Sequence, residues 1–95
     1  MSDVIAGAVE KLAEKMPDGF DGVARFDIEG EGSIMVDSDG VRAGAEDADV
    51  TLIADEDTFR ELMSGDLDPT SAYMGGRLKI EGDLGMAMKL GSSLS

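Results

Sequence analysis

The sequence predicts an α+β domain in which helices cover one face of a largely antiparallel sheet. Three observations lead to this prediction. The first residues carry an apolar stripe at helical spacing, and the middle of the chain alternates apolar and polar residues as strands do. The second half then runs strand, two short helices, strand and a last helix. With 95 residues and no internal repeat or linker, residues 1–95 are predicted to form a single domain.

The chain opens with a predicted helix. The segment Pro17-Asp18-Gly19 ends it and turns the chain. Its polar face mixes acidic and basic residues, which favours a helix that covers a core over one that lies on a membrane surface. The apolar stripe consists of Ile5, Ala8, Val9, Leu12, Ala13 and Met16.

Three strand-like segments follow, at residues 23–29, 33–37 and 41–44. Apolar and polar residues alternate along them, as expected when one face of a sheet is buried. Asp39-Gly40, between the second and third segments, is a strong signal for a hairpin turn. Residues 45–49 are predicted to be an acidic loop.

The second half begins with a buried strand at residues 50–54. A helix follows at residues 56–64, with Asp55 as its N-cap and Gly65 as its C-terminal stop. Asp68 caps the next short helix, whose first position is Pro69, where a missing N–H costs little.

A glycine pair at residues 75–76 ends this short helix and leads into a strand at residues 77–81. The last helix, residues 84–94, carries one charge, Lys89, among residues that are otherwise mostly apolar. Such a helix needs an apolar surface on nearly every side, either protein or bound ligand.

The composition excludes several classes of function. The chain has 21 acidic and 8 basic residues, a net charge of −13, and no His or Cys. This charge disfavours nucleic acid, and it predicts weak or no membrane association. Without His or Cys the usual catalytic base and the best nucleophile are missing, so we expect no enzyme activity and no cofactor. With no signal segment and no membrane span, a cytoplasmic protein is expected.

One acidic motif resembles part of a metal site. Asp37, Asp39 and Glu46 match three positions of a calcium-binding loop around Gly40. The residue at the first position would be Met35, which cannot ligate calcium as a carboxylate does, and the flanking segments are strands. We therefore favour an acidic hairpin and expect no metal.

The remaining candidates for function are apolar. The pattern predicts that eight residues line one sheet face, namely Phe26, Ile28, Ile34, Val36, Val50, Leu52, Leu78 and Ile80. Eight others can cover that face from the helices, namely Phe59, Leu62, Met63, Tyr73, Met74, Leu84, Met88 and Leu90. The chain has seven Met residues, which allow an interior to adapt its shape. Spacing alone does not tell whether the space between sheet and helices is filled or hollow.

Residues 48–55 with Phe59, residues 62–83 and residues 86–90 together resemble the sterol carrier protein type-2 (sterol-binding) domain family. The middle segment, residues 62–83, which includes Asp-Pro-Thr-Ser-Ala-Tyr-Met-Gly-Gly-Arg-Leu-Lys-Ile-Glu-Gly-Asp at 68–83, is the most specific part of the match. The resemblance implies a five-stranded sheet covered by helices, with an apolar tunnel for fatty acids, fatty acyl-CoA, sterols or other lipids. The residues then expected to line the tunnel are Phe26, Ile34, Leu52, Phe59, Met63, Met74, Leu78, Ile80, Leu84, Met88 and Leu90.

The first hypothesis is therefore non-enzymatic binding or carriage of a hydrophobic ligand. A second is a structural or protein-interaction module whose interior is solidly packed. A third is an accessory domain that presents lipid to an enzyme. Whether the chain forms a homodimer is left open.

Overall fold

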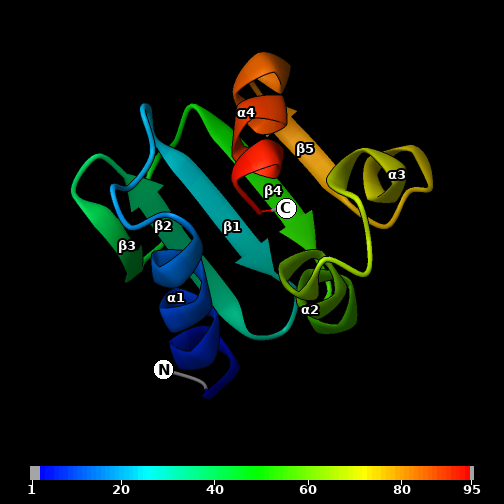
Figure 1. Ribbon diagram of the computed structural model, residues 1–95, viewed down its shortest axis with the longest axis horizontal. Coiled ribbons are helices and arrows are strands. Elements are labelled where there is room, and N and C mark those ends of the chain that lie inside the picture. Colours follow the sequence, from blue (N-terminus) through cyan, green and yellow to red (C-terminus); the bar gives the residue numbers. More distant parts are fainter. Residues whose placement is uncertain (1–2, 95) are drawn as a thin grey trace.

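The computed structural model describes residues 3–94, arranged as four helices and one sheet (Figure 1). The predicted order of helices and strands is confirmed, and each strand begins and ends within two residues of its expected position. The elements are α1 (Asp3–Lys15), β1 (Ala24–Ile28), β2 (Gly32–Asp37), β3 (Gly40–Ala43), β4 (Val50–Ala54), α2 (Glu56–Ser64), α3 (Pro69–Met74), β5 (Lys79–Gly82) and α4 (Leu84–Leu94). Within these residues, none of the helices is long and apolar enough to cross a bilayer.

The five strands form one sheet in the order β3-β2-β1-β4-β5. Neighbouring strands are antiparallel except the central pair, because β1 runs parallel to β4. The expected largely antiparallel sheet is thus confirmed, with one parallel pair at its centre. Asp37 and Gly40 pair at the end of the β2–β3 hairpin, where Asp39-Gly40 predicted the turn.

Alternation along the strands places one apolar face beneath the helices. On β1 the inward residues Ala24, Phe26 and Ile28 are buried. Phe26 lies opposite Ile34 on β2 and Leu52 on β4, so these three side chains form one row across the middle of the sheet. Figure 1 shows α1 and α4 crossing the face of the sheet, with α1 over β2 and β3 and α4 over β4 and β5.

The opposite face of the sheet also has a covered part. Met35 points away from the helices, yet it is only 1% exposed. The connection from β3 to β4 must cross β2 and β1, and Gly44 within it lies so close that a Cβ there would come within 3.3 Å of the Met35 Cγ. The Arg25 guanidinium donates to the Glu46 carbonyl at 3.3 Å, which holds this loop against the sheet.

Helix α2 has the caps that the sequence predicts. The Asp55 carboxylate accepts a hydrogen bond from the Thr58 backbone N–H at 2.7 Å. Gly65 ends the helix with a φ of 85°, in the left-handed region that suits glycine. Arg77, which precedes β5, forms an ion pair with Glu61 on α2 and so fixes this helix to the chain that follows it.

The N-cap of α2 predicts a specific dependence of stability on pH. The hydrogen bond from the Thr58 backbone N–H lowers the pKa of Asp55 below its ordinary value of 3.8. A carboxyl with a lowered folded-state pKa stabilises the protein above the unfolded pKa, and this contribution is lost as the pH falls through the folded-state pKa. Asp55→Asn keeps a capping side chain but removes the titration, so we expect its thermal midpoint to fall less on acidification.

The measurement is the thermal midpoint of both proteins from about pH 6 to about pH 3. Asp47→Asn, in the exposed loop before β4, is the matched control and should follow the wild-type curve. Parallel curves for Asp55→Asn and the wild type would show that this cap does not contribute to the acid sensitivity.

Candidate functional site

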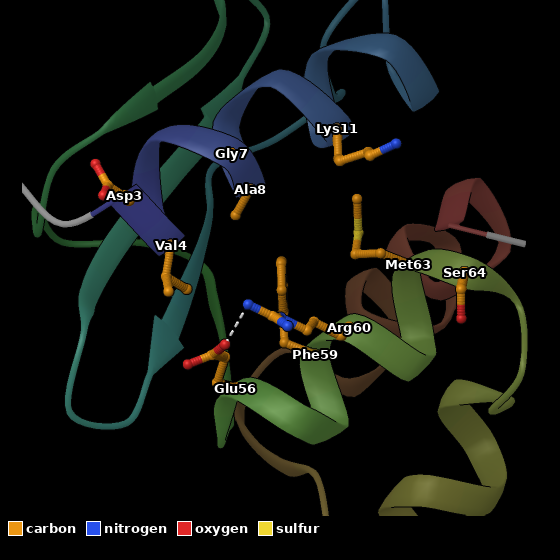
Figure 2. Close-up of a pocket in the computed structure, with 10 residues that line it drawn as sticks. All are labelled: Asp3, Val4, Gly7, Ala8, Lys11, Glu56, Phe59, Arg60, Met63 and Ser64. Carbon is orange, nitrogen blue, oxygen red and sulfur yellow. Dashed lines mark ion pairs between the residues drawn. The ribbon is translucent and has the colours of Figure 1, made fainter.

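A hollow of about 330 Å³ lies between α1 and α2 (Figure 2). This volume is at the lower end of the range found for pockets that bind small molecules. The lining residues come from α1 between Asp3 and Lys11 and from the side of α2 that is turned toward α1. They are Asp3, Val4, Gly7, Ala8, Lys11, Glu56, Phe59, Arg60, Met63 and Ser64.

The interior of this groove is apolar because small residues of α1 face larger ones of α2. Phe59 and Met63 form its α2 side and are 5% and 9% exposed. On α1 the facing residues include Gly7 and Ala8, and a Cβ added at Gly7 would meet nothing within 4 Å. The missing side-chain volume at Gly7 therefore helps to keep the two helices from filling the space between them.

The rim of the groove carries four charged residues, two of each sign. Arg60 forms an ion pair with Glu56 one turn earlier on α2, shown as a dashed line in Figure 2. Lys11, at the end of the groove near Met63, has no ion pair within residues 3–94. In a chain with a net charge of −13, this local balance makes the rim more favourable for an anion than most of the surface.

A smaller hollow of about 170 Å³ lies on the other side of the core. It is formed where the start of α3 meets α4 and the sheet strands β4 and β5. A Cβ at Gly91 would come within 3.2 Å of the Pro69 side chain, so α4 and α3 pack closely at this point. The lining residues are Leu52, Asp68, Pro69, Thr70, Leu78, Ile80, Ala87, Met88, Gly91 and Ser92.

The residues expected to line a tunnel fall into four groups. Phe59 and Met63 line the larger groove, and Leu52, Leu78, Ile80 and Met88 line the smaller hollow. Phe26, Ile34 and Leu90 lie in the core at 2%, 0% and 0% exposure. Met74 and Leu84 line neither hollow. The resemblance implies one continuous tunnel, whereas these two hollows share no lining residue.

The positions of Met74 and Leu84 correct the expectation that both cover the sheet. Met74 is 80% exposed and Leu84 is 46% exposed, and Tyr73 and Met88, which were expected on the same face, are 39% and 41% exposed. Helix α3 has only six residues, and its buried residue is Ala72. The next two residues, Tyr73 and Met74, lie on other faces of this helix. Leu84 is the first residue of α4. The residues of α4 that enter the core, Ala87 and Leu90, come after it.

The sequence predicts α1 only as a cover for the core. The part of the groove that α1 forms was therefore not predicted. A usable signal was present. Gly7 and Ala8 are adjacent small residues in the middle of the helix, and an interior glycine lowers helix stability by about 1 kcal/mol relative to alanine. A glycine inside a helix, despite this cost, indicates a position where a side chain would occupy needed space.

The match to a known protein family covers almost the whole chain. The sequence profile of the SCP-2 sterol transfer family matches residues 5–95. The chain belongs to the SCP-2 sterol transfer family. The resemblance found in the sequence, which rested on segments of the second half, is thereby confirmed and extended to the first half.

Individual relatives agree with this assignment. Hydroxysteroid dehydrogenase-like protein 2 of Xenopus laevis is 38% identical over 77 residues, which cover 73% of this chain and 18% of the relative. Sterol carrier protein 2 of Rattus norvegicus is 41% identical over 63 residues, which cover 66% of this chain and 10% of the relative. The chain therefore spans less than a quarter of the length of these relatives.

Solved structures show the same fold. The solution structure of sterol carrier protein-2 from Aedes aegypti, in complex with the fatty acid palmitate, superimposes with a TM-score of 0.80. It covers 100% of this chain and 97% of that protein at 17% sequence identity. Sterol carrier protein 2 like 2 from the same organism gives a TM-score of 0.77 at 22% identity, over 94% of each chain. At these identities the likeness establishes the sheet and helix arrangement.

Proposed function

We propose that the protein binds and carries a single-chain lipid, with the acyl chain in the groove between α1 and α2. The observation that supports this proposal is the groove itself, an apolar interior of about 330 Å³ with charges confined to its rim. Such a cavity matches an amphiphile, because the chain can leave water while the polar head stays at the surface. Family membership and the palmitate complex of the Aedes aegypti protein support the same class of ligand.

The polar head is proposed to be an anion such as a carboxylate, held near Lys11 and Arg60. Burial of the chain supplies the affinity, at about 0.8 kcal/mol for each CH₂ removed from water before the costs of ordering are subtracted. The rim cations add little free energy because they are exposed to solvent. Their role is to orient the ligand, head outward and chain inward.

The first test is native mass spectrometry of the freshly purified protein, followed by titration with palmitate. A bound mass of fatty-acid size, lost on denaturation, would support the proposal, as would a 1:1 complex formed with added palmitate. A protein that stays free of ligand and shows no thermal shift with palmitate or with sterols would favour the solidly packed interaction module.

The orientation of the head predicts a charge effect at Lys11. We expect Lys11→Gln to weaken palmitate binding by about two- to fivefold, the range for an exposed ion pair of about 0.5–1 kcal/mol. Hexadecanol has the same chain without a charge, so its affinity should not change. Calorimetric titration of both ligands measures the difference.

Lys15→Gln is the matched control, because Lys15 lies one turn further along α1 and does not line the groove. It removes the same charge from the same helix and should leave both affinities near wild type. Equal losses of palmitate affinity in the two variants would indicate a general effect of net charge and contradict the proposed position of the head.

An accessory role is a second candidate, supported by the names of the relatives. They include hydroxysteroid dehydrogenase-like proteins and the peroxisomal multifunctional enzyme A of Dictyostelium discoideum, of which this chain spans 13%. A domain of this kind could present lipid to an enzyme. That the chain itself has no enzyme activity, binds no nucleic acid, has weak or no membrane association and is cytoplasmic stays a prediction.

A further inference from the structure

The two hollows lie on opposite sides of a short row of side chains. Phe59 lines the groove between α1 and α2, and Leu52 lines the smaller hollow beneath α3 and α4. Phe26 lies between them. Its ring meets the ring of Phe59 edge to face, with centroids 5.6 Å apart and planes at 76°. On the sheet Phe26 is the register partner of Leu52, and both point to the helix side.

The row Phe59–Phe26–Leu52 thus runs from one hollow to the other through packed side chains. Phe26 and Phe59 are 2% and 5% exposed. Edge-to-face contact is a favoured geometry for two aromatic rings, so the pair is held in place by more than its buried area.

We infer that the Phe26–Phe59 pair is the divider between the two hollows and sets the length of the acyl chain that the protein accepts. This inference rests on the proposed function. A chain that enters from the rim at Lys11 and Arg60 extends along the groove until its methyl end meets the Phe59 ring. Carbons beyond that point find no space and stay in water or force the chain to fold back.

This arrangement predicts a characteristic dependence of affinity on chain length. Each methylene that enters the groove should strengthen binding by about fourfold, from the free energy of removing a CH₂ from water. Once the chain reaches the divider, further methylenes should add nothing, and the affinity should level off. Replacement of Phe59 by a small residue should deepen the groove as far as Phe26 and move the levelling point to longer chains.

The experiment measures dissociation constants for saturated fatty acids from octanoic to octadecanoic acid, by displacement of a fluorescent fatty acid. In the wild type we expect a rise and then a plateau. In Phe59→Ala we expect the same rise for short acids, with a plateau that begins several carbons later. A plateau at the same chain length in both proteins would overturn the inference while leaving lipid binding intact.

Leu62→Ala is the matched control, since Leu62 lies on the same helix, is 2% exposed and lines neither hollow. It should lower stability as a core truncation does without moving the plateau. Phe59→Leu retains more of the core volume and replaces Phe59→Ala in the experiment if the alanine variant does not fold. It should move the plateau in the same direction by fewer carbons.

A measurement on the wild type alone tests the same inference. With a fatty acid at the plateau length, labelled at its terminal methyl group, nuclear Overhauser contacts are expected to the ring protons of Phe59. Contacts from this methyl group to Leu78 or Ile80 would show that the chain passes the divider in the wild type and would overturn the inference. If no acid of the series binds to the wild type, both the proposed function and this inference fail.

Discussion

Gly7→Trp is expected to weaken palmitate binding at least tenfold. The position lines the groove, and nothing lies within 4 Å of a Cβ placed there, so the indole would enter the space assigned to the acyl chain. An indole that displaces a few methylenes removes about 0.8 kcal/mol of burial for each, and two such losses already exceed a factor of ten. Binding of palmitate to wild type and variant by calorimetric titration gives the ratio.

The same substitution should not destabilise the fold. Glycine is the weakest ordinary residue in a helix interior, and tryptophan has a higher helix propensity. We expect the thermal midpoint of Gly7→Trp to be equal to or above that of the wild type, so that unfolding cannot explain lost binding. The matched control is Ala6→Trp, one residue earlier on α1, at an exposed position that lines neither hollow. Equal palmitate affinity for both tryptophan variants would place the ligand outside this groove.

Gly82→Ala is expected to cause a large loss of stability. Gly82 ends β5 with a φ of 94°, in the left-handed region where other residues are strained by about 1–2 kcal/mol. A Cβ there would also overlap the Asp49 carbonyl oxygen, which accepts a hydrogen bond from the Asp83 backbone N–H at 3.0 Å. Backbone atoms cannot rotate away as a side chain does, so the overlap should add about 1–3 kcal/mol.

Gly76→Ala separates these two contributions. Gly76 has a φ of 79°, and a Cβ there would meet nothing within 4 Å, so only the backbone strain applies. Denaturant unfolding of the three proteins gives the free energies, and Gly82→Ala should lose clearly more than Gly76→Ala. Similar losses would mean that strand β5 shifts to accommodate the methyl group and that the junction with Asp49 is not rigid.

The local structure of this chain could be predicted from its sequence because local rules determine it. The alternation at Ala24, Phe26 and Ile28 identifies the buried face of β1, and Asp55 and Gly65 identify the ends of α2. Both predictions depend on residues within one turn or one strand. The fold class follows from the order of such elements.

The features that escaped prediction depend on contacts between distant segments. Alternation in β1 and β4 does not tell that they are parallel neighbours, nor that a loop buries Met35 on the far face of the sheet. The groove forms between Gly7 on α1 and Phe59 on α2, and these two helices are far apart in the chain. Apolar spacing also placed Met74 against the sheet, but a helix of six residues has too short a buried face to include it.

The parallel pairing of β1 with β4 has a consequence for the order in which the molecule assembles. Strands β1, β2 and β3 pair with neighbours in the sequence, so these hairpins close small loops, whereas β4 must reach β1 past both of them. Helix α2 follows β4 directly, so we expect its contact with α1 to form only after that pairing. A lipid in contact with both helices would then bind the folded protein and not the unfolded chain, and would raise the free energy of unfolding.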